Sequence, residues 1–451
     1  MTRSQGNFGS LKRNLGSLKF LKALINNRNT SPERVFLIGA ELKSGSVWDC
    51  RDSLLELTQL AQTAGGEVVG DGTQKLETPV AATFIGSGKA DEFARSCREQ
   101  NVDTVIFDDE LSPAQSRNLE AVFECKVIDR TALILDIFAQ RAKTREGKLQ
   151  IELAQLQHLL PRLTRFWGHL SRQKGGIGMR GDGETQLETD RRRVQDRISR
   201  ISGELEVVRR QRTTQRAGRQ RNNWPLASIV GYTNAGKSTL LNALTGASVL
   251  AEDKLFATLD PTTRRLRLPT NQNLLLTDTV GFIRKLPHGL VEAFKATLEE
   301  VVEADLLLHV VDASHPKAED QIQAVNEVLH EIGASEKPLL MVFNKIDQPG
   351  AMDSLRGLLQ RFPAGVGVSA RSGEGIAALL EELGTRLRPT RDFVRLRIPH
   401  DAAALIARLH EVAQVVERNY TGRAATFKAR IPPHLRAEFA GYIVEDFQSA
   451  G

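Results

Sequence analysis

A glycine-rich pattern typical of phosphate binding lies near the middle of the chain, after an apolar segment at 226–230 and before a helical segment at 239–244. It reads Gly231-Tyr232-Thr233-Asn234-Ala235-Gly236-Lys237-Ser238 and fits G-x-x-x-x-G-K-[ST]. Between a strand and a helix, the backbone N–H groups of such a loop cradle phosphates. We expect Lys237 to reach the β- and γ-phosphates and Ser238 to bind Mg²⁺. The pattern therefore predicts an α/β nucleotide-binding domain.

A second motif follows about forty residues later. The apolar segment 274–277 ends in Asp278-Thr279-Val280-Gly281. A carboxylate at the end of a strand can hold the water shell of Mg²⁺, and a glycine N–H can contact the γ-phosphate. Asp-x-x-Gly by itself is most often an ordinary turn. Its position after the phosphate loop is what indicates a nucleotide site.

A third motif predicts which base is bound. The apolar segment 339–343 ends in Asn344-Lys345-Ile346-Asp347. The carboxylate of Asp347 can accept two N–H bonds from the guanine edge, and adenine has no such donors. A site built to bond a ligand group can reject an analogue that lacks it by ~10⁴-fold. Further along the chain, three residues are expected to close over the base: Ser369, Ala370 and Arg371. The sequence predicts GTP and GDP as ligands, with a solvated turn as the alternative for this motif alone.

The ordered set of motifs resembles a translation-factor-type GTPase domain of the Ras-like superfamily. By that resemblance, Phe256-Ala257-Thr258-Leu259-Asp260 lies in the first switch loop, and Thr258 supplies the second hydroxyl ligand of Mg²⁺. Thr262 and Thr263 remain alternatives for that ligand. All three threonines could instead be ordinary turn residues.

The group that orients the attacking water is not evident. Many such GTPases carry a glutamine directly after Asp-x-x-Gly, and here that position is Phe282. Positioning and electrostatics supply most of the catalysis of phosphoryl transfer, so we predict a slow basal turnover, below about 1 s⁻¹, that rises when a partner orders the switch segments. Arg284 and Lys285 could assist as cations, although exposed surface charge is the simpler interpretation. The catalytic residue is therefore left unknown.

The alternation of strands and helices divides the 451-residue chain into five segments. We expect a mobile basic tail at 1–32, for which an organelle transit peptide is the alternative, and an α/β domain at 33–143. A helical segment at 144–222 and the GTPase domain at 223–389 follow, and a small α+β unit at 390–451 ends the chain. Segments 35–38, 83–86, 104–107, 126–128 and 394–398 are predicted as strands, and 402–418 as a helix. No apolar run approaches the ~20 residues needed to span a bilayer.

The segment 144–222 has the pattern of a helical hairpin. Leucines at 149, 153, 156, 160 and 163 recur at steps of four and three, as do apolar residues at 194, 198, 201, 205 and 208. A glycine-rich stretch at 175–183 separates the two patterns. Neither helix can bury its stripe alone, so we predict that the two helices pair with each other in an antiparallel arrangement, with the glycine-rich loop at the tip.

Basic residues are concentrated at 1–30, which hold six basic residues and no acidic one, and at 191–221. The chain has a net charge of +6, and residues 191–221 hold eleven arginines against three acidic residues. Such a segment favours a polyanionic partner. We predict RNA contacts by Arg180, Arg191, Arg192 and Arg193, because arginine pairs with phosphate and stacks on bases. A solvated coiled-coil face is the alternative.

Several long stretches resemble the HflX family. They are 108–115, 145–156, 175–193, 256–264 and 278–282, and the resemblance extends over about 35–388. It implies a cytoplasmic GTPase that uses Mg²⁺ and binds the large ribosomal subunit and its rRNA. It also implies a role in splitting or rescuing ribosomes under stress. We expect a monomer when the protein is off the ribosome. Two other functions remain open: a GTP-switched scaffold for a protein partner without RNA contact, and an ATP-using RNA remodeller.

Overall fold

The computed structural model describes residues 32–42, 50–163, 182–220, 224–246, 255–285, 298–387 and 391–447, without the side chains of 182–187, 212–220 and 434. Residues 1–31 of the basic tail predicted at 1–32, residues 175–181 of the glycine-rich stretch predicted at 175–183, and with them Arg180, lie outside these ranges. The chain divides into two compact units, one ending at Gln140 and one starting at Arg141. Within the described ranges no helix is both long and apolar enough to cross a membrane.

The first unit is built on a sheet of four parallel strands in the order β2-β1-β3-β4. Helices follow the strands in the alternation expected for α/β folds. Phe36, Phe93 and Phe123 are among the residues of its core. The elements are β1 (Arg34–Leu42), α2 (Cys50–Ala64), β2 (Glu67–Leu76), α3 (Ser87–Glu99), β3 (Thr104–Phe107), α4 (Pro113–Phe123), β4 (Lys126–Asp129) and α5 (Arg130–Arg141).

One predicted strand of this unit is wrong and another was missed. The segment 83–86 is a turn in which Phe84 has a φ of 63° and Gly86 caps α3. The edge strand is instead β2, whose sequence is polar and contains two glycines. These glycines make room for aromatic rings, since a Cβ on Gly72 would lie 2.6 Å from the ring of Phe93. The glycines that allow this packing also weaken the strand pattern in the sequence.

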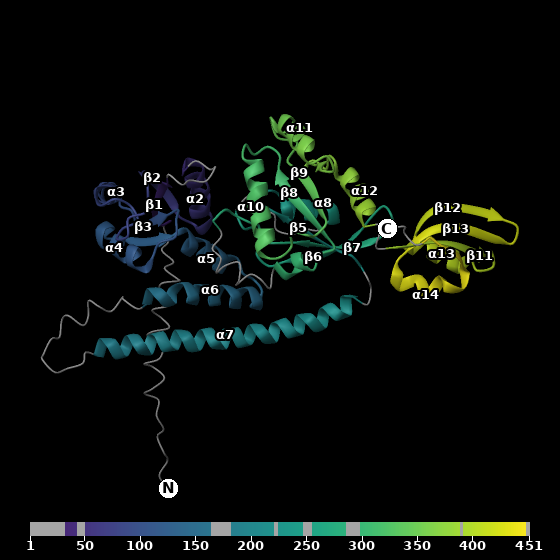
Figure 1. Ribbon diagram of the computed structural model, residues 1–451, viewed down its shortest axis with the longest axis horizontal. Coiled ribbons are helices and arrows are strands. Elements are labelled where there is room, and N and C mark those ends of the chain that lie inside the picture. Colours follow the sequence, from purple (N-terminus) through teal and green to yellow (C-terminus); the bar gives the residue numbers. More distant parts are fainter. Residues whose placement is uncertain are drawn as a thin grey trace, which may run out of the picture. The chain divides into compact units, whose positions relative to one another are not determined.

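The second unit begins with the predicted helical pair, α6 (Arg145–Leu163) and α7 (Asp182–Gln220) (Figure 1). Two ion pairs show that the helices are antiparallel: Arg197 Nε is 2.7 Å from Glu152 Oε1, and Arg145 Nη2 is 3.1 Å from Glu204 Oε2. The predicted apolar stripes meet between the helices, except for Val208, in one cluster of Leu149, Leu153, Leu156, Leu160, Leu163, Val194, Ile198, Ile201 and Leu205. Each helix therefore buries its stripe against the other.

A six-stranded sheet with the order β10-β9-β8-β5-β7-β6 follows, parallel except for the β6–β7 pair. Helices α8 and α12 pack on one face, and α10 and α11 contribute to a separate core cluster. This arrangement confirms the predicted Ras-like class. The elements are β5 (Leu226–Gly231), α8 (Lys237–Thr245), β6 (Thr262–Arg267), β7 (Asn273–Asp278), β8 (Leu306–Asp312), α10 (Ala318–Glu331), β9 (Leu339–Asn344), α11 (Ala351–Arg361), β10 (Val366–Gly367) and α12 (Ile376–Arg386).

The chain ends in an antiparallel sheet with the order β12-β13-β11-β14. The helix predicted over 402–418 is too long, because it ends at Val412 and residues 414–421 form β12. Pairing with β13, which buries alternate side chains, overrides the helical spacing of the segment. The elements are β11 (Asp392–Pro399), α13 (Ala403–Val412), β12 (Gln414–Thr421), β13 (Ala424–Ile431), η3 (Pro433–Leu435), α14 (Arg436–Phe439), η4 (Ala440–Tyr442) and β14 (Ile443–Asp446).

Candidate functional site

The phosphate loop joins β5 to α8 and holds its lysine inside the protein. Gly236 has a φ of 91°, and a Cβ there would lie 2.2 Å from Asn344 Nδ2, so only glycine fits. Lys237 is 6% exposed and donates hydrogen bonds to the carbonyl oxygens of Gly231, at 3.2 Å, and Tyr232, at 2.8 Å. Burial lowers the pKa of Lys237 to about 8, against the opposing charge of Asp278. The ammonium group is therefore already in position for a phosphate.

Three oxygen-bearing side chains meet at one corner of the loop. Ser238 Oγ lies 2.7 Å from Thr258 Oγ1 and donates to Asp278 Oδ2 at 2.6 Å. Asp278 is fully buried, and its Oδ1 has no hydrogen-bond partner among the described residues. Burial raises the pKa of this carboxyl group, while the nearby charge of Lys237 lowers it. Hydroxyl and carboxylate oxygens are ligands that Mg²⁺ prefers, so these residues fit the ion.

The two alternative metal ligands lie elsewhere. Thr263 Oγ1 is 2.9 Å from Thr277 Oγ1, within the β6–β7 ladder. Thr262 begins β6 and pairs with Asp278 across the same ladder. Of the three threonines, Thr258 is the one whose hydroxyl contacts Ser238. The geometry therefore supports Thr258 as the second ligand.

A cavity of about 50 Å³ opens between the phosphate loop and the predicted switch segment. Thr239 is the lining residue that the sequence analysis did not name, although its place at the start of α8, directly after Ser238, could have indicated it. The lining residues are Thr233, Asn234, Gly236, Lys237, Ser238, Thr239, Phe256, Ala257, Thr258, Thr279 and Gly281. The cavity therefore brings together residues of the phosphate loop, the switch segment and the Asp-x-x-Gly motif.

Asn344 connects the base-recognition motif to the phosphate loop. Its side-chain Nδ2 donates to the carbonyl oxygen of Ala235 at 2.9 Å, and its Oδ1 accepts from the N–H of Ala370 at 3.0 Å. Lys345 forms an ion pair with Asp312 at 2.7 Å. Asp347 is exposed and three residues further along the chain than this bridge. One amide group thus joins the base-recognition motif to the phosphate loop and to the segment 369–371.

The other residues predicted to contact the base are Ile346, Ser369 and Arg371, and they differ in burial. Ile346 and Ser369 are buried, and Ser369 Oγ accepts a hydrogen bond from the N–H of Ser372 at 3.0 Å, which stabilises the turn. Arg371 is exposed. Contacts of these three residues with a base stay predictions.

Four other predicted residues are held by the protein framework. Thr279 Oγ1 donates to the carbonyl oxygen of Ile229 at 2.6 Å, and the hydroxyl of Tyr232 accepts from the N–H of Arg284 at 3.0 Å. Leu259 and Val280 are buried at 3% and 7% exposure. These side chains fix the shape of the loops around the cavity.

Phe282 extends the sheet next to the phosphate loop. Its carbonyl oxygen accepts from the N–H of Thr233 at 2.7 Å, and its own N–H donates to the carbonyl oxygen of Gly231 at 3.1 Å. The ring is 2% exposed. A buried phenyl group cannot orient a water molecule, and this agrees with the sequence interpretation of the position.

Asp260 makes a contact that the sequence analysis missed. Its Oδ2 accepts from the backbone N–H groups of Lys143, at 2.8 Å, and Thr144, at 2.9 Å, and its Oδ1 accepts from Thr144 Oγ1. Thr144 Oγ1 in turn accepts from the N–H of Gly147 at 3.0 Å and so caps α6. A Cβ on Gly147 would lie 2.6 Å from Asp260 Oδ1, so glycine permits the approach. A nucleotide contact of Asp260 stays a prediction.

The predicted RNA-contact residues in the described part of α7 are on its surface. Arg191, Arg192 and Arg193 are exposed, and Arg193 Nη1 lies 3.2 Å from Asp190 Oδ1. Whether these residues touch RNA stays a prediction.

Comparisons with known proteins agree with this geometry. Three sequence families match in succession: "GTP-binding GTPase N-terminal" over residues 51–139, "GTP-binding GTPase Middle Region" over 141–219 and "50S ribosome-binding GTPase" over 227–345. The chain is 50% identical to the GTPase HflX of Escherichia coli K12 over 373 residues, which cover 82% of this chain and 87% of that protein. The chain belongs to the HflX family.

A second relative from the HflX family gives the same result. The GTPase HflX of Caldanaerobacter subterraneus subsp. tengcongensis is 47% identical over 397 residues, covering 87% of this chain and 90% of that protein. Among solved structures, the GDP complex of SsGBP is 26% identical, covers 78% of this chain and 98% of its own, and has a TM-score of 0.45. The HflX resemblance stated from the sequence is confirmed, and the chain is a GTPase of a family that generally uses Mg²⁺.

Proposed function

We propose that this GTPase binds the large ribosomal subunit through its helical pair and that GTP controls the binding. GTP would occupy the cavity between the phosphate loop and the switch segment, with Asp347 on the guanine edge. Ser238 and Thr258 would hold Mg²⁺, and the ion would supply positive charge to the phosphates. ATP is disfavoured because adenine would leave the carboxylate of Asp347 unpaired.

The observation that carries this proposal is the contact between Asp260 and the start of α6. Thr258 is one of the three side chains that meet where Mg²⁺ would bind, and Asp260 is two residues further along the same segment. Bound Mg²⁺ and the γ-phosphate would hold Thr258 at this position, and loss of the γ-phosphate would release the segment that carries Asp260. Because Asp260 bonds Lys143 and Thr144, such a change reaches the first turn of α6 directly. GTP and GDP would thus favour different positions of the helical pair.

Hydrolysis in this site would depend mainly on positioning. Lys237 places a buried positive charge on the phosphates, and the N–H of Gly281 can contact the γ-phosphate. Phe282 offers no group to orient the water. We therefore expect slow turnover by the isolated protein and faster turnover once a ribosome orders the switch segment.

The helical pair has the charge needed for RNA. Arg191, Arg192 and Arg193 lie exposed on α7, and the Coulomb attraction to rRNA phosphates would supply affinity that falls with salt. Sequence-independent contacts of this kind suit a crevice lined by the RNA backbone. We further propose that the protein acts in the cytoplasm as a monomer that splits or rescues ribosomes under stress.

The arginines provide a direct test. Purified large subunits are sedimented with the protein, a non-hydrolysable GTP analogue and several salt concentrations. Replacing Arg191, Arg192 and Arg193 by Gln should weaken binding and reduce the slope of log affinity against log salt by up to about two. Arg356→Gln serves as the control, because Arg356 is exposed on α11. Unchanged affinity and slope in the triple variant would refute RNA contact by this face.

A further inference from the structure

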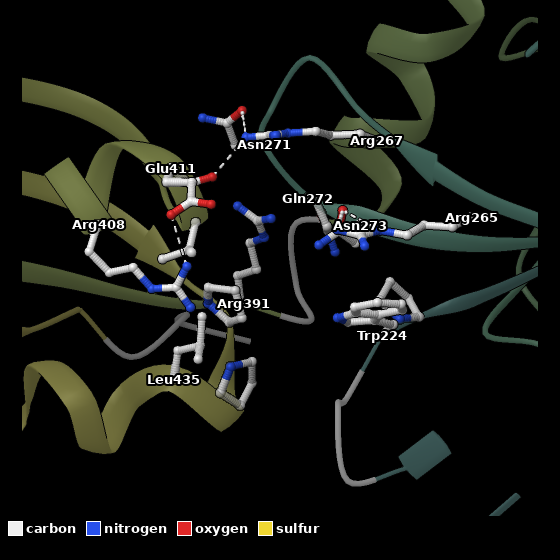
Figure 2. A pocket seen from close by; sticks show the side chains of 14 residues that line it. Trp224, Arg265, Arg267, Asn271, Gln272, Asn273, Arg391, Arg408, Glu411 and Leu435 are labelled. Carbon is white, nitrogen blue, oxygen red and sulfur yellow. Dashed lines mark hydrogen bonds and ion pairs between the residues drawn. The ribbon is translucent and has the colours of Figure 1, made fainter. Parts of the chain in front are cut away.

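A second cavity lies in the second unit, outside the nucleotide site (Figure 2). Its volume is about 210 Å³. One wall comes from residues 224–225, directly before β5, and from the β6–β7 hairpin, and the other comes from the C-terminal segment that starts at residue 391. The lining residues that the argument uses are Trp224, Arg265, Arg267, Arg391, Arg408 and Glu411.

The charge of this cavity is strongly unbalanced. Of the residues that the structure describes, four arginines line it and Glu411 is the one lining carboxylate. Glu411 is 2.9 Å from Arg408, which also lies 3.5 Å from Glu438. Among the described residues, none of the other three arginines has an ion-pair partner. Three positive charges therefore remain without a compensating carboxylate.

Neutral groups hold these arginines in place. The guanidinium group of Arg265 lies 4.6 Å from the centre of the Trp224 ring and donates to Asn273 Oδ1 at 3.0 and 3.2 Å. Arg267 donates to the carbonyl oxygen of Glu411 at 2.9 Å and to Asn271 Oδ1 at 3.3 Å. The donors are therefore positioned in advance while their charge is left available, which is what an anion site requires.

Arg391 is the buried member of the group. It is 7% exposed, and it donates to the carbonyl oxygens of Thr270, at 3.1 Å, and Arg430, at 3.5 Å. Its Nε has no hydrogen-bond partner among the described residues. Burial lowers the pKa of Arg391 to about 10. A buried charge with an unsatisfied donor is costly unless an anion pairs with it.

We propose that this cavity binds a phosphate group between Arg265, Arg267 and Arg408, with the buried charge of Arg391 in the same lining. Its volume is below the ~300–1,000 Å³ of ordinary small-molecule sites, so it suits a phosphate rather than a whole nucleotide. The phosphate is either part of an RNA strand that crosses the opening or part of a free phosphorylated compound. Bound there, it would join the β6–β7 hairpin to the C-terminal segment through charge on both sides. This inference does not depend on ribosome binding.

Trp224 provides a local readout of the cavity. The chain has three tryptophans, so the replacements Trp48→Phe and Trp167→Phe leave Trp224 as the sole indole. The protein is first saturated with GDP, so that the phosphate loop is occupied. Pyrophosphate and a ten-nucleotide oligouridine are then titrated separately while Trp224 fluorescence is recorded.

We expect a saturable change with at least one of the two probes. A response to pyrophosphate indicates a free compound as the natural ligand, and a response to oligouridine alone indicates RNA. The paired replacement Arg265→Gln and Arg267→Gln should weaken binding about tenfold or more, because each removes a charge-assisted hydrogen bond. Arg264→Gln is the matched control, since Arg264 is exposed on β6 and does not line the cavity.

Arg391→Gln tests the buried donor, and thermal unfolding shows whether that variant is folded. If Arg391→Gln does not fold, the paired variant at the exposed positions Arg265 and Arg267 still decides the test. No fluorescence response to either probe, or equal affinities in the native protein, the paired variant and Arg264→Gln, would overturn the proposal.

Discussion

The carboxylate of Asp260 accepts a hydrogen bond from the backbone N–H of Thr144 at 2.9 Å. The two residues are 116 positions apart in the sequence, and they join the switch segment to the start of α6. A conformational change is explained only when a ligand interacts differently with the two states. In the proposed function, the γ-phosphate would provide that difference at Thr258, and Asp260 would pass it to the helical pair.

Removing this contact should leave GTP binding intact and make binding to the large subunit less dependent on the nucleotide. In Asp260→Ala, we expect GTP affinity to stay within about threefold, because the side chain bonds Lys143 and Thr144 instead of lining the phosphate cavity. Large-subunit binding should lose most of its preference for the GTP state. Calorimetry and sedimentation measure the two quantities.

Gly147→Ala tests the same contact by a different route, because its Cβ would lie 2.6 Å from Asp260 Oδ1 and displace the carboxylate. Gly203→Ala is the control: Gly203 lies in α7, and a Cβ there meets no atom within 4 Å. If Asp260→Ala and Gly147→Ala both bind the large subunit with the full preference for the GTP state, Asp260 does not couple the nucleotide site to the helical pair.

The cluster of Ser238, Thr258 and Asp278 predicts that replacing Thr258 and replacing Thr263 have different effects on GTP binding. Thr258→Ala removes a hydroxyl that lies 2.7 Å from Ser238 Oγ, so Mg²⁺-dependent GTP affinity and turnover should both fall, by about tenfold or more. Thr263→Ala removes a hydroxyl that bonds Thr277 in the β6–β7 ladder, and it should change neither by more than about twofold. Titrations with and without Mg²⁺ measure the effect. Equal losses in the two variants would argue against Thr258 as a ligand.

The preference of the site for guanine should depend on the carboxylate of Asp347. Asp347→Asn replaces a carboxylate that accepts two N–H bonds, and the loss of two charge-assisted hydrogen bonds should weaken GTP binding about 100-fold. Xanthosine triphosphate should then bind better than GTP, because its base carries an oxygen that the new amide N–H can reach. Competition against labelled GDP gives both affinities. GTP binding that survives the replacement would place guanine recognition elsewhere.

Stability should fall in acid because of one buried histidine. His309 in β8 is 1% exposed, and burial, with a smaller contribution from Lys237, lowers its pKa to about 3 from 6.5. The unfolded chain takes up a proton below pH 6.5 and the folded one does not, so stability is lost as the pH falls from 6.5 toward 3. By pH 5 the loss is about 2 kcal/mol.

Urea unfolding of the nucleotide-free protein at pH 7.5 and pH 5 measures this loss. His309→Leu removes the titrating group, so the drop in its free energy of unfolding between the two pH values should be smaller by about 2 kcal/mol. An identical drop in both proteins would mean that His309 is protonated in the folded state or is not the responsible group.

The sequence predicted the motifs of the nucleotide site well because glycine, lysine, asparagine and aspartate each have a specific role there. Segments whose conformation depends on distant partners are harder to predict from the sequence. Strand β2 was missed because Gly70 and Gly72 exist to accommodate the rings of Phe36 and Phe93. Residues 414–418 were assigned to a helix, although pairing with β13 makes them a strand.

Contacts between distant segments were not visible at all. The bond from Asp260 to Thr144 joins two short polar stretches with no shared pattern. The arginine-lined cavity likewise combines Arg265 and Arg267 with Arg391 and Arg408 from another part of the chain. Only the folded arrangement brings these charges together.

The central claim is that GTP controls binding to the large ribosomal subunit. Its most direct test is sucrose-gradient sedimentation of the full chain with purified large subunits, in a non-hydrolysable GTP analogue and, in parallel, in GDP. We predict that the protein sediments with the subunit in the GTP analogue and remains largely at the top of the gradient in GDP. Equal occupancy with both nucleotides, or none with either, would contradict the account.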